Sequence, residues 1–101
     1  MTDTIKLGTC RDFDRILVKT RHSVYEMIVL SAESGDVMVR GGVFGVEFQR
    51  ATLTGSTFGG SAVKRRAVCV GRFLELHVGG KAFVTSSVQG ASHHRLAADA
   101  A

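Results

Sequence analysis

Histidine and cysteine are the residue types in this chain best suited to metal binding or nucleophilic catalysis. A zinc site needs three or four such ligands, usually at spacings such as CxxC or HxxxH, and neither spacing occurs in the sequence. No GxSxG nucleophile motif is present, and Cys69 lies in an apolar run that favours a small buried side chain over a reactive thiol. We therefore expect no enzyme activity, no cofactor and no metal site from Cys10, Cys69, His22, His77, His93 and His94.

Three glutamates interrupt apolar segments, and these carboxylates could line a ligand pocket. Glu26 and Glu47 are the candidates for such a pocket, and Glu75 occupies a similar position in a third segment. Two desolvated carboxylates close together would raise one pKa and permit acid–base chemistry. The alternative is that each glutamate is the outward member of an alternating strand, paired with an arginine across the sheet. Glu26 fits this alternation least well.

Positive charge gathers at one place in the sequence. Lys64, Arg65 and Arg66 follow a stretch of small residues and glycines, and the chain carries a formal net charge of +4. Three consecutive cations could bind phosphates in a salt-dependent manner, although a solvated basic turn would have the same composition. Nucleic-acid binding is therefore one candidate function, with Arg40 as a further contact and Phe58 as an aromatic that could stack on a base.

The segment from Val37 to Val43 reads VMVRGGV. It resembles the second motif of Sm-like proteins, an apolar strand that ends in Arg-Gly before another strand. In that family the arginine lines an RNA-binding site on a ring of small barrels, so the resemblance implies an RNA contact for Arg40. More broadly, residues 25–88 resemble small, uncharacterised bacterial β-barrel proteins.

Strands joined by glycine turns must position these side chains. The chain has twelve glycines and no proline, and the glycines fall between apolar runs. The clearest unit is a β-hairpin over residues 72–86, because Gly79 and Gly80 tolerate the positive φ angles of a two-residue turn. This turn places Leu76 opposite Phe83 and Glu75 opposite Val84.

The remaining apolar runs predict further strands at 15–19, 24–30, 36–40, 43–54 and 67–70. A bend near Gln49–Arg50 would bring both halves of the fifth segment to one core. We therefore expect an all-β fold, a small antiparallel barrel or strongly curved sheet of six to seven strands. An open two-sheet sandwich is the alternative. The expected core is Leu17, Tyr25, Met27, Val29, Val37, Val39, Phe44, Val46, Phe48, Val68, Val70, Leu74, Leu76 and Phe83.

The 101 residues correspond to one domain. We place the β domain at residues 1–90 and a flexible, alanine-rich tail at 91–101. The chain shows neither a signal-peptide pattern nor an apolar run long enough to span a membrane, which favours a cytoplasmic protein with no membrane partner. The sequence leaves open whether Cys10 and Cys69 pair.

Apolar residues outnumber the positions that one small core provides. Those predicted on the opposite faces of the strands are Val24, Ile28, Leu30, Met38, Phe73 and Val84. Because exposed apolar patches mark interfaces, we expect a non-catalytic binding or assembly module that acts as a homo-oligomer, most simply a dimer. Nucleic-acid binding through the basic loop and a small-molecule pocket are the alternatives.

Overall fold

The computed structural model describes residues 4–58 and 63–95, and it confirms the all-β prediction. Short glycine-rich connections separate the strands, and the helical elements of the described residues are two single 3₁₀ turns. In chain order the elements are β1 (Thr4–Lys6), η1 (Leu7–Thr9), β2 (Arg15–Thr20), β3 (Val24–Ser31), β4 (Asp36–Gly41), η2 (Gly42–Phe44), β5 (Gln49–Thr57), β6 (Val63–Arg65), β7 (Ala67–Cys69), β8 (Phe73–Val78) and β9 (Lys81–His94).

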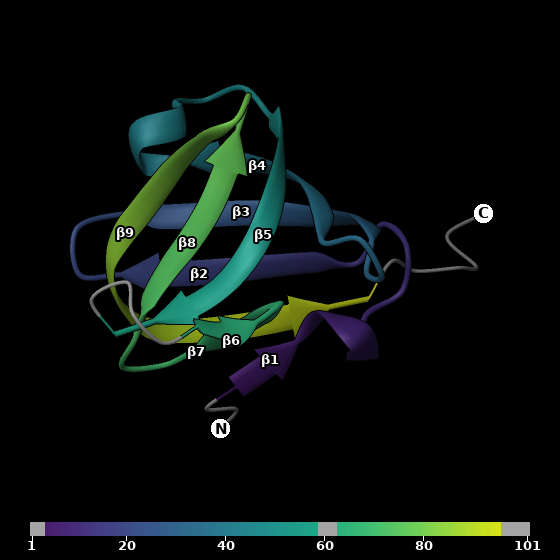
Figure 1. Ribbon diagram of the computed structural model, residues 1–101, viewed down its shortest axis with the longest axis horizontal. Coiled ribbons are helices and arrows are strands. Elements are labelled where there is room, and N and C mark those ends of the chain that lie inside the picture. Colours follow the sequence, from purple (N-terminus) through teal and green to yellow (C-terminus); the bar gives the residue numbers. More distant parts are fainter. Residues whose placement is uncertain (1–3, 59–62, 96–101) are drawn as a thin grey trace.

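Six antiparallel strands close into a barrel. The main sheet has the order β4-β3-β2-β9-β8-β5-β6, and an additional pairing between β4 and β5 joins its two sides. In Figure 1, β5, β8 and β9 lie in front of β2 and β3 and cross them steeply. A second, two-stranded sheet of β1 and β7 lies near one end of the barrel, where it buries Ile5 and Val68 in the core together with Leu7 of η1.

The long strand β9 connects the two halves of the barrel. It pairs with β8 as far as Ser87 and with β2 from Val88 to His94. The register with β2 shifts between Lys19 and Thr20, and such an irregularity bends the sheet. The strand thus continues past residue 90, where we had placed the start of a tail, because β2 offers backbone partners up to His94. Residues 96–101 of that tail lie outside the described part of the chain.

The hairpin of β8 and β9 has the predicted register. Leu76 pairs with Phe83 and Glu75 with Val84. Gly79 and Gly80 both have positive φ, 57° and 81°, as the two central positions of a type I′ turn require. This turn fixes which side of each strand faces the core.

The core follows the predicted alternation in β3, β4 and β8 but differs elsewhere. In β2, Ile16 and Val18 are fully buried and Leu17 faces outward, opposite Glu26. Leu17 shares this outward side with the charged residues Arg15 and Lys19, which flank the apolar run and are both exposed. Val46 is also wrong as a core residue, since it is exposed.

The segment predicted as one strand from Val43 to Thr54 begins instead with a 3₁₀ turn and a loop. Gly41, Gly42 and Gly45 all have positive φ, which breaks the extended backbone before β5 begins at Gln49. The turn keeps Phe44 in the core and points Val46 to solvent. The irregularity in β5 lies between Leu53 and Gly55, not at the predicted position.

Candidate functional site

One candidate site lies on the outer face of β2, β3 and β4. Glu26, in the middle of β3, pairs with Leu17 of β2 on one side and with Arg40 of β4 on the other. Directly opposed residues of neighbouring strands share a face of the sheet. The three side chains therefore lie in one row across the outside of the barrel.

Two arginines hold both oxygens of the Glu26 carboxylate. Arg40 contacts Oε1 through NH2 at 2.7 Å and through Nε at 2.8 Å, and NH2 of Arg15 lies 2.8 Å from Oε2. The guanidinium of Arg40 also lies over the ring of Phe48, 4.4 Å from its centroid. Only 15% of the Glu26 side chain is exposed. Glu26 is thus the outward, arginine-paired member of its strand, which is the second of the two arrangements that the sequence left open.

A shallow hollow of about 360 Å³ opens beside this ion-paired group. Its walls are largely apolar, and it is lined by Leu17, Val24, Glu26, Arg40, Gly41, Gly45 and Val46. Val46 at its rim is 86% exposed, Val43 in the adjacent turn is 67% exposed and Val24 is 58% exposed. The hollow is therefore bordered by projecting hydrophobic side chains.

The other predicted site residues do not gather here. Glu47 is exposed in the loop after η2 and does not line the hollow. Lys64 and Arg65 are exposed on β6, which lies at the end of the barrel opposite η2 in Figure 1. Arg66 follows at a positive φ of 49°. The structure thus brings Arg40 to Glu26 and not to the basic segment.

The predicted surplus of apolar residues is found on the outer faces. Val24 and Val84 are exposed, and the other members are half-buried. Three of these residues lie on the same side of the sheet as Glu26. They are Ile28 and Leu30 of β3 and Met38 of β4. The outer face of this sheet thus combines apolar side chains with the arginine–glutamate group, and it also carries the charged residues Lys19 and Asp36.

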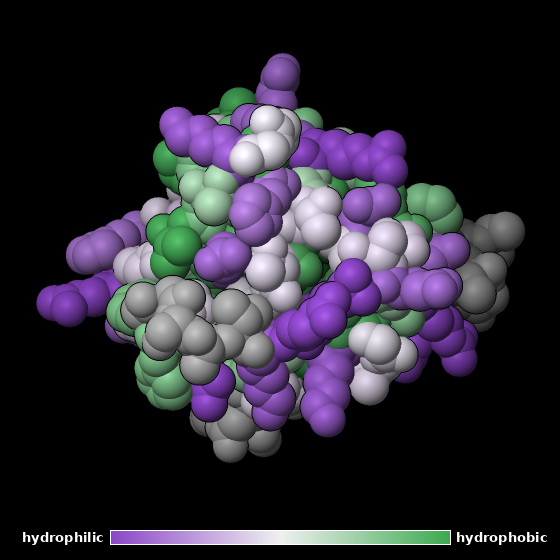
Figure 2. Space-filling view, in the orientation of Figure 1, coloured by the Kyte–Doolittle hydropathy of each residue, from purple (hydrophilic) through white to green (hydrophobic). Residues whose placement is uncertain are grey.

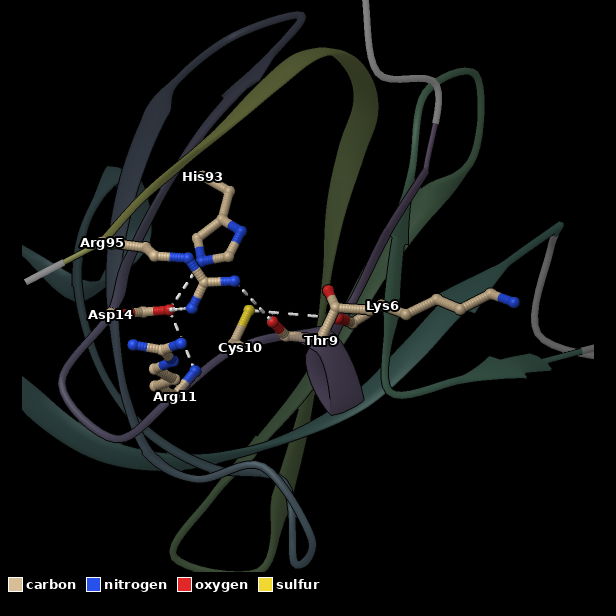
Figure 3. Close-up of polar contacts among 7 residues, drawn as sticks. All are labelled: Lys6, Thr9, Cys10, Arg11, Asp14, His93 and Arg95. Carbon is tan, nitrogen blue, oxygen red and sulfur yellow. Dashed lines mark hydrogen bonds and ion pairs between the residues drawn. The ribbon is translucent and has the colours of Figure 1, made fainter.

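A second cluster, which the sequence did not reveal, consists of Cys10, Asp14 and His93 (Figure 3). Its three ligand atoms all lie within 4.8 Å of one another. The Nε2 atom of His93 is 2.7 Å from Oδ2 of Asp14, and NH1 of Arg95 is 3.4 Å from the same oxygen. Asp14 is 1% exposed, so a carboxylate is buried among groups that can donate to it.

A tight turn before β2 positions the cluster. The backbone N–H of Arg11 donates to Oδ2 of Asp14 at 2.9 Å, and the N–H of Asp14 donates to the carbonyl of Arg11 at 3.1 Å. Phe13 between them adopts a positive φ of 69°. Backbone hydrogen bonds from Phe13 N to Val29 O and from Val29 N to Asp14 O attach the turn to β3. His93 reaches it because β9 pairs with β2.

The thiol of Cys10 is held in its neutral form. Burial raises the pKa of Cys10, and the nearby Asp14 carboxylate raises that pKa further, while Thr9 and Arg95 act weakly in the opposite direction. Both Cys10 and Cys69 are buried free thiols. The cluster is therefore not an activated nucleophile, but its sulfur, oxygen and nitrogen atoms are all metal-ligand types.

Comparison with family models, with curated proteins and with solved structures finds no match to this chain. Within residues 4–58 and 63–95, no helix has both the length and the apolar character to cross a bilayer.

Proposed function

We propose that this domain is a non-catalytic assembly module that forms a homodimer through the hollow on the outer face of β2, β3 and β4. We call the hollow and its rim the β3 face. In the proposed dimer, the contacts with the second copy come from Leu17, Val24, Val43 and Val46, which surround the ion pair of Glu26 and Arg40. A second copy of the chain is the occupant that best matches this surface.

The supporting observation is that a projection and a recess lie on the same patch. Val46 is 86% exposed at the edge of a hollow of about 360 Å³. A two-fold interface uses the same patch on both partners, so the patch must be complementary to itself. Val46 of each copy can then enter the hollow of the other. An interface of this kind removes four apolar side chains per copy from water.

Charge and sheet topology favour the same interpretation. Glu26 is already paired within its own chain by Arg15 and Arg40, so a partner needs to supply no counter-charge. Edge-to-edge strand pairing through β4 is not available, because β4 pairs with β3 and β5. The opposite side of the barrel is different in character, since its coloured surface is mainly hydrophilic or near-neutral and the hydrophobic side chains on it are scattered (Figure 2).

We rank the two alternatives below self-association. Arg40 is engaged by Glu26 and Phe48, and the ring of Phe58 is covered by the guanidinium of Arg72, 4.4 Å from its centroid. Arg40 and Phe58, the residues expected to assist Lys64 and Arg65 in nucleic-acid binding, are thus engaged in contacts within the chain. A small-molecule pocket at Glu26 is ranked lower because both carboxylate oxygens already have partners.

The substitution Val46→Asp tests the dimer directly. Burying one valine stabilises by about 1.5–3 kcal/mol, and each change counts twice in a symmetric dimer. We therefore expect the dimer to dissociate at least about 100-fold more readily. Light scattering at micromolar concentration should give about twice the chain mass of 10.8 kDa for the natural sequence and the single-chain mass for the variant.

The matched control is Val84→Asp, which places the same charge at an exposed valine on β9, away from the hollow. This variant should remain a dimer. A natural protein of single-chain mass would contradict the proposal. So would dissociation of the dimer by both substitutions to the same extent.

A further inference from the structure

We propose that Cys10, Asp14 and His93 bind a zinc ion, with water in the fourth tetrahedral position. The three ligands come from two segments that are distant in the sequence, since Asp14 and His93 are 79 residues apart. Their ligand atoms nevertheless lie within 4.8 Å of one another. This site is independent of the β3 face, and it replaces the expectation from sequence spacing that the chain has no metal site.

The geometry of the cluster is close to that of a zinc site. Bonds of 2.0–2.3 Å at tetrahedral angles place ligand atoms about 3.3–3.8 Å apart. The separations in the cluster are at most 4.8 Å, so the longest needs to shorten by about 1.0–1.5 Å, whereas the 2.7 Å contact between His93 Nε2 and Asp14 Oδ2 needs to lengthen by about 0.6 Å. Cys10 lies next to η1 and Asp14 lies in the turn before β2, so both ligands come from one short connection, where a small adjustment leaves the barrel strands in place.

The donor types select the class of cation. A thiolate, an imidazole nitrogen and a carboxylate oxygen form a mixed set that suits Zn²⁺, whereas Mg²⁺ and Ca²⁺ require mostly oxygen ligands. Binding converts the Cys10 thiol to a thiolate, and its proton leaves to solvent. The contact between His93 and Asp14 is then replaced by bonds from both side chains to the metal.

Arg95 supplies a positive charge near Asp14 when no metal is bound. Its NH1 atom is 3.4 Å from Asp14 Oδ2 and its NH2 atom is 3.4 Å from the carbonyl of Thr9. Both contacts are long, and the side chain is 51% exposed, so the guanidinium can move into solvent. In Figure 3 it lies beside the imidazole of His93 and above Cys10. Arg95 is thus a competitor of the cation rather than a ligand.

Titration with Co²⁺, followed by displacement with Zn²⁺, tests the site in the intact chain. Tetrahedral Co²⁺ bound to a thiolate absorbs in the near ultraviolet by sulfur-to-metal charge transfer, so the spectrum itself reports Cys10. We expect this absorption in the natural protein, and we expect Zn²⁺ to abolish it. Cys10→Ala should remove the absorption and weaken Zn²⁺ binding at least about 100-fold, because a ligand contributes more than the 10–100-fold typical of outer-shell groups. Cys69→Ala should leave both unchanged.

One further pair of variants and one single variant separate this site from surface histidines and from loss of folding. His93→Gln should abolish the charge-transfer absorption, whereas His94→Gln should retain it. Arg95→Gln should tighten Zn²⁺ binding about threefold to fivefold, the equivalent of one exposed ion pair, and this exposed change leaves the core intact. The proposal is overturned if the natural protein shows no thiolate absorption, if binding depends on His94 rather than His93, or if Arg95→Gln weakens it.

Discussion

The substitution Gly41→Ala, which adds a single methyl group, is expected to lower the free energy of unfolding by about 3–4 kcal/mol. This is the largest loss that we predict from adding one methyl group. Gly41 ends β4 with φ 102° and ψ 168°, a region that only glycine adopts readily and that costs an L side chain about 1–3 kcal/mol. A Cβ here would also lie well inside van der Waals contact with the carbonyl oxygen of Val24. That oxygen belongs to the backbone of β3, so it cannot move aside as a flexible side chain would.

Urea unfolding measures this change as a fall in the midpoint concentration at constant slope. The matched control is Gly8→Ala, because Gly8 is outside the left-handed region and its Cβ would meet no atom within 4 Å. The control should lie within about 1 kcal/mol of the natural protein. Equal stability of the two variants would contradict the strain that we assign to the junction of β4 and η2.

This junction also shows where sequence reasoning reached its limit. The alternation of Phe44, Val46 and Phe48 is typical of a strand, and the sequence predicted one. Positive φ at three glycines around it is a property of the backbone that composition does not specify, and it turns Val46 outward. The most exposed large hydrophobic side chain among the described residues was therefore predicted to be in the core.

Elsewhere the local pattern was sufficient. In β3 and β4, Met27, Val29, Val37 and Val39 alternate with more polar or less buried residues, and all four are buried as predicted. The glycine pair of the β8–β9 hairpin fixed the register because a two-residue turn leaves only one pairing. In β2 the apolar run of Ile16, Leu17 and Val18 gives no parity by itself. The signal lay in the flanking charges, because Arg15 and Lys19 share the outward side of the strand with Leu17.

The candidate sites depended on long-range pairing to different degrees. Glu26 and Arg40 are 14 residues apart across one hairpin, and an arginine partner for Glu26 was one of the two alternatives that the sequence offered. The Cys10, Asp14 and His93 cluster depends on β9 changing its partner from β8 to β2. No local motif encodes that change. An aspartate placed just before an apolar strand was the only available signal, and by itself it indicates a turn.

The small sheet of β1 and β7 is attached to the barrel through a buried hydroxyl group. Ser56 of β5 is fully buried. Its Oγ donates to the carbonyl of Ala67 at 2.7 Å and accepts a hydrogen bond from the N–H of Cys69 at 2.9 Å. In an antiparallel pair, alternate residues direct their backbone groups away from the partner strand. The Ser56 hydroxyl thus binds the carbonyl of Ala67 and the N–H of Cys69, the two backbone groups that β7 directs toward β5.

Ser56→Ala is expected to cost about 2–4 kcal/mol, because it leaves a buried donor and a buried acceptor without the hydroxyl that binds them, at about 1–3 kcal/mol each. Urea unfolding measures the loss of stability. The exchange rate of the Cys69 amide hydrogen should rise at least by the factor by which the substitution raises the equilibrium constant for global unfolding. Ser92→Ala is the control, since the Ser92 hydroxyl is exposed and contacts only His94 among the described residues. The stability of this variant should change by less than about 0.5 kcal/mol.

The β1–β7 sheet leads directly into η1 and Cys10, so Ser56→Ala should also weaken the thiolate–Co²⁺ absorption, even though Ser56 is not a ligand. A Ser56→Ala protein as stable as the Ser92→Ala protein would show that other contacts hold this sheet on the barrel.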